Sequence, residues 1–252
     1  MADRDAMIEA MSRELAADRF KDYTLNGLQV EGKSEIKRVM SGVTACQALL
    51  DQAVEWQADL LLVHHGYFWK SEPVGVVGIK RRRLATLLEH RINLVAWHLP
   101  LDAHPRLGNN ALLGERMGWR VERALDGELG TGLLYSGRAD RILDHCGFAA
   151  QLEQRLGRAP LVIQGHDRPL ERICWCTGGA QDMIEAAHAG GADAFVSGEI
   201  SERTTHLARE LGISYFAAGH HATERDGVRA LGEWLASGFD IEHRFVDIDN
   251  PV

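Results

Sequence analysis

The feature that most constrains the fold of this chain is an internal repeat of short apolar segments. Residues 192–196 repeat the pattern of residues 58–62 at an offset of 134, and residues 213–217 repeat that of 92–96 at an offset of 121. The offsets differ by 13 residues, which places an extra segment in the first copy, and the irregular stretch 66–76 fits it. Chance similarity between βαβ units remains an alternative for the strands alone. The repeat nevertheless favours two similar halves.

Short apolar strands alternate with segments of helical periodicity, which is typical of βαβ units and a mainly parallel sheet. We therefore predict an α/β fold made of an N-terminal half, 1–125, and a C-terminal half, 126–252, without an inserted third domain. A metal site is expected between the halves. The predicted strands are 36–44, 59–63, 92–97, 130–136, 160–164, 172–176, 192–196 and 213–217. The predicted helices are 5–17, 45–57, 78–91, 109–117, 140–156 and 180–190.

Composition excludes several classes of protein. The 252 residues carry a formal charge of −8, which disfavours nucleic-acid wrapping without a local basic patch. No apolar run approaches the roughly 18 residues that a membrane span needs, and the first residues do not resemble a signal peptide. The four cysteines form no C-x-x-C pair, and Cys174 and Cys176 are expected as buried thiols. A reducing cytoplasm fits this usage.

Histidines and carboxylates follow three of the predicted strands. His98 and Asp102 precede His220 and Glu224 by the same offset of 122 residues. Ligands of open parallel sheets bind at the carboxyl ends of the strands, so these side chains are candidates for one site. The full set at the strand ends is His64, His65, His98, Asp102, His220 and Glu224.

Imidazole and carboxylate are the usual ligands of zinc, manganese, iron and nickel. Six such groups match the number that a pair of adjacent metal ions requires. Adjacent histidines also arise by chance in a chain with 12 of them, so the placement after strands carries the argument. Surface or structural roles are expected for His90, His145, His166, His188, His206 and His243.

The ordered motifs resemble those of the GTP cyclohydrolase I type 2 family, also called the Ngg-interacting-factor-three-like family. They are Asn-Gly-Leu-Gln-Val at 26–30, His-His-Gly-Tyr-Phe at 64–68, His-Leu-Pro-Leu-Asp at 98–102 and Gly-His-His-Ala-Thr-Glu at 219–224. The resemblance covers nearly the whole chain and indicates the short bacterial form. Gly66 departs from the family, in which many members have proline after the two histidines.

This resemblance implies a dinuclear centre and a toroidal homohexamer. The positions that match the family's metal ligands are His64, His65, Asp102, His220 and Glu224. They would hold two divalent ions per chain, of zinc, manganese, iron or nickel, with Glu224 contacting both and Asp102 as a second candidate to do so. His98 is a candidate catalytic residue, which could be a ligand, a partner of a ligand or a proton donor. The side chain of His221 is expected to point elsewhere.

The resemblance also implies metal-dependent hydrolysis of a nucleotide, and a phosphorylated small molecule is a possible partner. The alternative is a non-catalytic metal-binding ring that docks partners or handles metals. Each further nucleotide signal has a structural alternative. The turn 177–180 could hold a phosphate or be a tight turn. The basic run 80–83 could attract phosphates or be a solvated helix face. The aromatic residues 67–69 could stack a base or pack the loop. We expect the 66–76 loop to gate or line the site.

Overall fold

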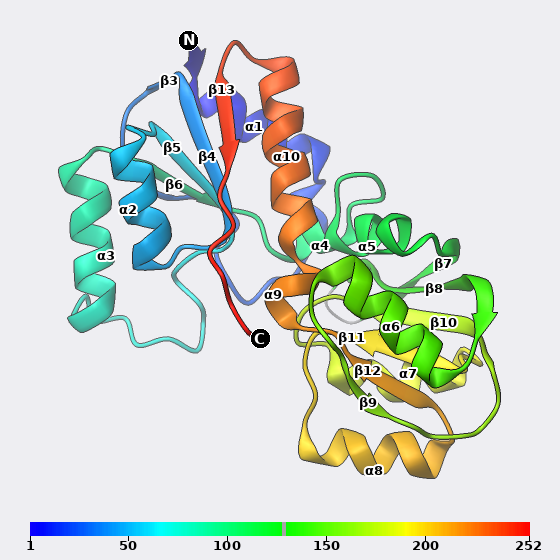
Figure 1. The fold of residues 1–252 in the computed structure, drawn as a ribbon. Coiled ribbons are helices and arrows are strands. Elements are labelled where there is room, and N and C mark those ends of the chain that lie inside the picture. The colour runs from blue at the N-terminus through cyan, green and yellow to red at the C-terminus, as the bar shows by residue number, and fades with distance from the viewer. Residues whose placement is uncertain (128–129) are drawn as a thin grey trace. The chain divides into compact units, whose positions relative to one another are not determined.

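The computed structural model describes residues 1–127 and 130–252, and the chain divides into two compact units. The first unit comprises Met1–Leu101 and Gly227–Asp249, and the second comprises Asp102–Asp226 and Asn250–Val252. Each contains a sheet with helices packed on it (Figure 1). The chain passes from the first unit to the second after Leu101, and a segment near its end returns to the sheet of the first unit. The division into halves at 125/126 stays a prediction.

The first unit is built on a sheet with the strand order β13-β4-β5-β6-β2. All neighbouring strands are parallel except β2, which pairs antiparallel with β6. The strands are β2 (Gly27–Val30), β4 (Arg38–Thr44), β5 (Leu60–His65), β6 (Asn93–Ala96) and β13 (Glu242–Phe245). A short ribbon beside it joins β1 (Ala2–Asp3) to β3 (Glu35–Ile36).

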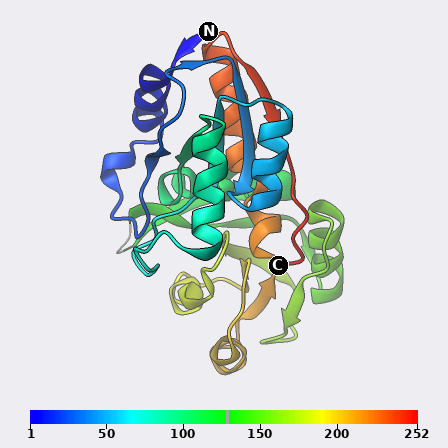
Figure 2. The ribbon, with the colours of Figure 1, turned by 90° about the vertical axis from the view of Figure 1, so that its left-hand side faces the viewer.

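Helices cover both faces of this sheet. The helices of the first unit are α1 (Arg4–Glu14), η1 (Ala17–Arg19), α2 (Gln47–Glu55), α3 (Gly78–Glu89) and, for most of its length, α10 (Arg225–Gly238). On one side α2 and α3 lie together, and α10 lies on the other (Figures 1 and 2). Leu49, Leu50 and Leu87 from these helices pack with Met40 and Leu61 of the strands in one buried cluster. The alternation of inward side chains along the strands therefore fixes which face each helix covers.

The second unit has the strand order β7-β8-β10-β11-β12-β9. Its centre, β10-β11-β12, is parallel, and the outer strands pair antiparallel. The strands are β7 (Arg120–Gly127), β8 (Gly130–Leu143), β9 (Leu161–Ile163), β10 (Leu170–Cys176), β11 (Ala194–Ser197) and β12 (Ser214–Ala217). The helices are α4 (Leu99–Ala103), whose first residues belong to the first unit, α5 (Asn109–Met117), α6 (His145–Leu156), η2 (Gln181–Met183), α7 (Ile184–Ala189), α8 (Glu202–Leu211) and α9 (His220–Thr223).

The core of the second unit is aromatic. Trp175 on β10 is fully buried and contacts Trp119 and Tyr135, with ring centroids 4.9 and 5.6 Å away. Phe148 of α6 meets Phe216 of β12 edge to face at 4.8 Å. Large rings of this kind supply most of the apolar area that holds a helix on a sheet.

The internal repeat appears in both sheets as the same arrangement. In each, three parallel strands follow in chain order and a short antiparallel strand borders the third: β4-β5-β6 with β2, and β10-β11-β12 with β9. The expected α/β fold with two similar halves is confirmed in this sense. Among the described residues the first sheet is mainly parallel, whereas the second sheet is mixed, because β7, β8 and β9 pair antiparallel. The extra segment of the first copy is the irregular stretch between β5 and α3, whereas β11 is followed closely by α8.

Two details differ from the sequence-based expectation. The helix expected over 140–156 begins at His145, because β8 continues to Leu143 and the Asp144 side chain then caps the helix at Gly147 N. The longer segments that were not expected as regular elements form β2, β7, β13, α8 and α10. No helix within the described ranges is both long and apolar enough to cross a membrane.

Candidate metal centre

Three imidazoles gather at the carboxyl ends of β5 and β6 in the first unit. His64 and His65 end β5, and His98 follows β6. The ring centroid of His64 lies 4.5 Å from that of His65 and 5.1 Å from that of His98. One ring nitrogen of each residue lies within 4.8 Å of the others, close enough for the three to hold a metal ion.

The rings are oriented by hydrogen bonds through Nδ1. His64 Nδ1 donates to the carbonyl oxygen of Trp97 at 2.9 Å, and His98 Nδ1 lies 2.9 Å from a carboxylate oxygen of Asp22. A metal-binding histidine commonly donates its second ring N–H to a carbonyl or a carboxylate, which fixes its tautomer and ring orientation. The tautomer that these contacts favour leaves Nε2 as the ligand atom.

Asp22 is a site residue that the sequence analysis missed. It is buried, and its carboxylate also accepts hydrogen bonds from the side chain of Asn26 and the backbone N–H of Leu99. Burial opposes ionisation, but the hydrogen bond and charge of His98 outweigh it and lower the pKa of Asp22 to about 2. Nothing in the local sequence distinguishes this aspartate, since its partner lies 76 residues away.

The loop that follows β5 lines the imidazoles, as expected. The ring of Trp69 lies 5.0 Å from His98 and 5.8 Å from His65. Tyr67 is buried instead, and its hydroxyl donates to the carbonyl of Ala45. Phe68 is exposed beneath the ammonium of Lys80. The three aromatics therefore have separate roles: one packs the loop, one lines the site and one faces solvent.

Gly66 is required by the packing of this loop. A Cβ at this position would lie 2.2 Å from Oε1 of Gln29. That oxygen accepts a hydrogen bond from Tyr67 N at 2.6 Å, and moving it would break this hydrogen bond. Gln29 thus anchors the start of the loop beside Gly66.

In the second unit, a histidine lies between two carboxylates at the end of β12. His220 Nε2 is 3.1 Å from Glu224, and its Nδ1 is 2.7 Å from Glu199. Burial disfavours the imidazolium, but the hydrogen bonds and charges of Glu224 and Glu199 outweigh it and raise the pKa of His220 to about 9. This environment attracts a cation, whether a proton or a metal ion.

Glu199 was also missed by the sequence analysis. A signal for it exists in the repeat, because Glu199 stands at the offset of 134 from His65. It follows β11 as His65 ends β5. The two copies of the repeat therefore place different ionisable groups at an equivalent point.

The turn after β10 packs against Glu224, which supports the structural alternative over a phosphate loop. Gly178 has a φ of +67°, and a Cβ there would lie 2.1 Å from Oε1 of Glu224. Its N–H donates to the hydroxyl of Thr223 at 3.1 Å, so it is already bonded within the unit. Glycine at 178 therefore gives the Glu224 carboxylate room beside β10.

Asp102 lies in the same unit as Glu224. It accepts hydrogen bonds from Asn109 Nδ2 at 2.8 Å and from the hydroxyl of Thr177 at 3.4 Å. The buried Cys176 thiol lies in the field of both carboxylates, and burial together with their charges raises its pKa. Asp102 and Glu224 keep their equivalence in the repeat, but the boundary at Leu101 assigns both to the second unit.

The six histidines outside the site that were expected to have structural or surface roles have such surroundings. His145 and His243 bond the buried hydroxyls of Ser214 and Ser41, at 2.6 and 2.7 Å. His166 bonds the carbonyl of Asp193 at 2.9 Å. The exposed members are His90, His188 and His206. His221 belongs to none of the metal-capable groups within the part of the chain that the structure describes.

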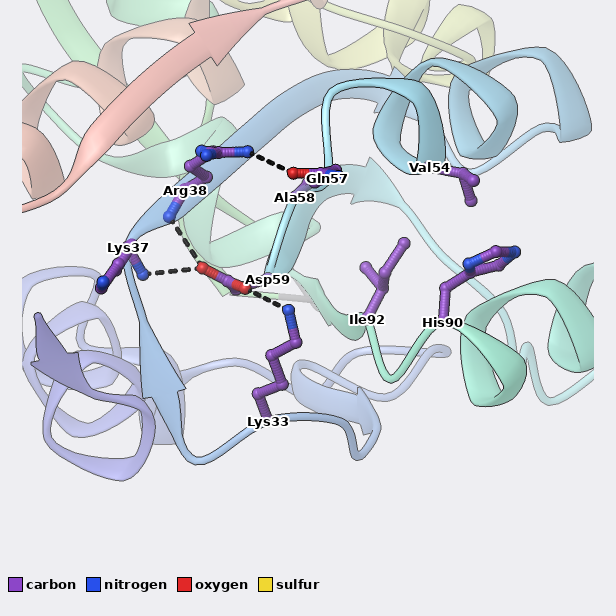
Figure 3. Close-up of a pocket in the computed structure, with 9 residues that line it drawn as sticks. All are labelled: Lys33, Lys37, Arg38, Val54, Gln57, Ala58, Asp59, His90 and Ile92. Atoms are coloured by element: carbon purple, nitrogen blue, oxygen red, sulfur yellow. Dashed lines mark hydrogen bonds and ion pairs between the residues drawn. The ribbon is translucent and has the colours of Figure 1, made fainter.

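A cavity of about 420 Å³ lies at the opposite end of the first sheet, where β4, β5 and β6 begin. Figure 3 shows Asp59 inside it, bonded to the ammonium of Lys33 and to the backbone N–H groups of Lys37 and Arg38. In the second unit, Asp193 bonds the N–H groups of residues 171 and 172 in the same way. These aspartates join strand starts, so the cavity belongs to the scaffold and not to the metal chemistry.

The fold and the strand-end side chains define an α/β protein with a candidate metal centre of histidines and carboxylates. The family model described as Duf34/NIF3 (NGG1p interacting factor 3) matches residues 2–251, and the chain belongs to this family. The resemblance of the sequence motifs is thereby confirmed.

Relatives of high similarity carry the name GTP cyclohydrolase 1 type 2 homolog. The protein of that name from Pseudomonas aeruginosa is 52% identical over 246 residues, 98% of this chain and 97% of the relative. Its counterpart from Escherichia coli K12 is 49% identical over 246 residues, 97% of each chain. The similarity therefore spans nearly the full length of both proteins.

Solved structures share the fold over the whole chain. The protein ybgI, described as of unknown function, matches with a TM-score of 0.95 and 46% identity, covering 100% of both chains. A protein from Thermus thermophilus matches with a TM-score of 0.88 and 34% identity, again over 100% of both.

Proposed function

We propose that this protein is a metal-dependent hydrolase that acts on a nucleotide, with two divalent metal ions bound per chain. The ligands of the proposed centre are His64, His65, Asp102, His220 and Glu224. The observation that carries the proposal is the way His64 and His220 are held. Each lies at the carboxyl end of a parallel strand, and each has Nδ1 bonded to an acceptor of the protein.

The chemistry of the donor set fits divalent transition metals. Imidazole nitrogens with carboxylate oxygens suit zinc, manganese, iron and nickel alike, so the donor set does not select one of them. The placement of His220 between Glu199 and Glu224 supports the same conclusion, because a bound cation would replace the proton that these carboxylates otherwise stabilise. Divalent ions held there would supply Lewis acidity and lower the pKa of water.

The protein's own residues would orient the ligands and shield them. Trp69 and Tyr23 pack edge-on against His98, at centroid distances of 5.0 and 5.1 Å, and limit the access of water from that side. Glu199, which is partly exposed, holds the proton on His220 Nδ1 and so keeps Nε2 available to a ligand. Gly178 keeps the Glu224 carboxylate in place beside β10.

A nucleotide is the substrate class that the names of the relatives support, since they are called GTP cyclohydrolase 1 type 2 homologs. The exposed ring of Phe68, with Lys80 5.1 Å from its centroid, is a surface on which a base and a phosphate can be recognised together. We further propose that the protein works in the cytoplasm as a homohexameric ring.

The test is turnover by purified protein loaded with each of the four metals and incubated with GTP and a panel of phosphoesters. We expect hydrolysis that disappears in Glu224→Ala, together with a fall in metal content to one ion or fewer per chain. His221→Ala should keep two ions, and His188→Ala, on the exposed face of α7, is the control.

Elemental analysis separates the possible outcomes. If the loaded protein binds two ions but hydrolyses none of the compounds, the non-catalytic metal-binding ring is the better description. If Glu224→Ala keeps two ions, or His221→Ala loses them, the ligand assignment is wrong.

A further inference from the structure

The cavity at the start of the first sheet has a counterpart in the second unit, and the internal repeat shows what the scaffold itself requires there. Arg38 and Asp59 correspond to Arg172 and Asp193 at the offset of 134, and the strands beside them pair in the same register. Each arginine donates to the carbonyl at the C-terminal cap of the helix that follows its strand, at 3.0 and 3.4 Å. Both copies therefore join their strand starts with the same two side chains.

The large volume of the cavity is a feature of the first copy. It measures about 420 Å³ there, whereas a cavity of about 10 Å³ lies beside Arg172 in the second unit, with room for one water molecule at most. The residue before the arginine also differs, because Lys37 corresponds to Glu171, whose carboxylate bonds Arg138. The walls of the cavity belong to the scaffold, but joining the strand starts requires neither its volume nor Lys37.

The charges around the cavity are mainly positive, although the chain as a whole carries −8. Its nine lining residues include three cations, of Lys33, Lys37 and Arg38, and one carboxylate, that of Asp59. They give the lining a formal charge of +2 with its histidine neutral. Among the residues drawn in Figure 3, the ammonium of Lys37 bonds to none, whereas that of Lys33 bonds to Asp59. A concave surface of this charge attracts an anion.

One feature of the fold opposes an anion at this place. Helix α2 ends beside the cavity, and the C-terminal end of a helix carries a partial negative charge. The guanidinium of Arg38 offsets this charge, because it donates to the carbonyl of Trp56 at 3.0 Å. The two lysines therefore remain as the cations that an anion would meet.

The cavity has a charged side and an apolar side. Figure 3 shows the charged groups around Asp59 and, on the other side, Val54, Ile92 and the ring of His90. Cavities of about 300–1,000 Å³ with such a division commonly bind small organic molecules. A phosphomonoester carries a charge of about −1.5 to −2 at neutral pH, which matches the lining, whereas a monocarboxylate would leave one cation unbalanced.

We propose that this cavity binds a small phosphomonoester with an apolar or planar body. Lys33 and Lys37 hold the phosphate, and the body lies against Val54, Ile92 and the imidazole of His90. This site is a second one, apart from the candidate metal centre and independent of the proposed function, since it needs neither a metal ion nor hydrolysis.

The position of the cavity on the sheet keeps its ligand away from the imidazoles of the first unit. Asp59 lies at the start of β5 and His64 near its carboxyl end. The intervening five residues of extended strand span about 16 Å. A molecule that fills the cavity therefore does not contact His64.

The test is calorimetric titration of the full chain with phenylphosphonate, inorganic phosphate and benzoate. Phenylphosphonate joins a planar ring to a dianionic head through a phosphorus–carbon bond, so that a hydrolase cannot cleave it as an ester. We expect one equivalent to bind per chain. Its affinity should be about 10-fold or more above that of phosphate, which buries no ring, and above that of benzoate, which has a single negative charge.

Substitutions place the probe in the cavity. Lys37→Gln should weaken phenylphosphonate and phosphate alike by about 10–100-fold, because a charged hydrogen bond is lost. Lys37→Glu, which copies position 171, should abolish binding. His90→Ala should weaken phenylphosphonate but not phosphate. Both side chains are exposed, so these variants should fold. Lys21→Gln, at an exposed lysine outside the cavity, is the matched control and should bind as the wild type does.

The variant Glu224→Ala separates this site from the candidate metal centre, and it should bind phenylphosphonate with unchanged affinity. Loss of binding in that variant would place the probe at the metal centre and overturn the proposal. Unchanged affinity in Lys37→Gln, equal affinity for phenylphosphonate and benzoate or phosphate, or no binding at millimolar concentration would overturn it as well. None of these results bears on the proposed hydrolysis, which turnover tests separately.

Discussion

Histidines of this protein differ in charge according to what surrounds the ring. His220 lies between Glu199 and Glu224, which raise its pKa to about 9 against the effect of burial. His243 has the hydroxyl of Ser41 beside it, at 2.7 Å, and burial lowers its pKa to about 4. The first environment suits a cation, whereas the second requires a neutral ring.

The stability of the protein should therefore depend on His243 in a defined pH window. Because its pKa is lowered on folding, the unfolded chain takes up the proton first as the pH falls. The contribution of His243 to the free energy of unfolding is complete above about pH 6.5. It is lost as the pH falls from 6.5 to about 4, and the loss is up to about 2–3 kcal/mol. Urea unfolding at pH 7, 6 and 5 should show a smaller loss for His243→Gln than for the wild type. Identical profiles would contradict this account of His243.

A methyl group at Gly178 should disturb the metal centre. Gly178→Ala places a Cβ 2.1 Å from the Glu224 carboxylate and also strains a backbone with φ of +67°. The matched control is Gly157→Ala, where φ is +77° but no atom lies within 4 Å of the added Cβ. Both should lose about 1–2 kcal/mol from backbone strain. Only Gly178→Ala should lose bound metal by elemental analysis, and equal metal content in the two variants would show that Glu224 tolerates the displacement.

At the scale of elements, one aspartate in each sheet forms hydrogen bonds that connect the start of one parallel strand to the start of its neighbour. Asp59 precedes β5 and bonds the N–H groups of Lys37 and Arg38, and Asp193 precedes β11 and bonds those of residues 171 and 172. Lys33 adds an ion pair to Asp59 at 2.6 Å, which is much shorter than the 3.9 Å pair of Arg168 with Asp193. These hydrogen bonds join the starts of the parallel strands, at the end of each sheet opposite to the candidate ligands.

Removing these aspartates should destabilise the fold without touching the metal site. We expect Asp59→Ala to lower the free energy of unfolding by about 2–3 kcal/mol and Asp193→Ala by about 1–2 kcal/mol, because backbone donors lose a charged acceptor. Urea titrations measure both, with the exposed Asp18→Ala as the control. Metal content should be unchanged. A loss of metal in Asp59→Ala would mean that the two ends of the sheet are coupled.

Two of the glycines of helix α10 differ in what surrounds them: Gly232 lies inside the helix and Gly238 is its last residue. A Cβ at Gly232 would lie 2.1 Å from His243 Nε2, whereas nothing lies within 4 Å of one at Gly238. Alanine is favoured over glycine inside a helix by about 1 kcal/mol. Gly232→Ala should therefore lower the thermal midpoint and Gly238→Ala should keep or raise it. The reverse order would show that the His243 ring can move aside.

At the scale of the whole molecule, the last part of the chain is shared between the units. The segment Gly227–Asp249 belongs to the first unit, where β13 pairs in parallel with β4. The chain thus begins in the first unit, forms the second, returns, and ends in the second with Asn250–Val252. The chain consequently passes from one unit to the other after Leu101, after Asp226 and after Asp249.

The proposed homohexameric ring gives a prediction at the same scale. Mass measurement in solution should give about six times 27.9 kDa, as expected for the homohexamer that the family resemblance implies. Sedimentation at micromolar concentration, with and without a chelator, would establish whether the assembly requires metal. A stable monomer would exclude the hexamer.

The sequence by itself determined the α/β class, the repeat and the ligand candidates, because these depend on local patterns: apolar alternation, and histidines placed at the ends of strands. Even the correspondence of His98 with His220 could be read as a fixed offset. Tertiary structure alone decided what holds those side chains. Asp22 is 76 residues from His98 in the sequence, and Glu199 is 21 residues from His220. Strand β13 pairs with β4, which lies about 200 residues earlier in the chain. Such pairings arise from packing between distant segments, which leave no periodic trace in the sequence.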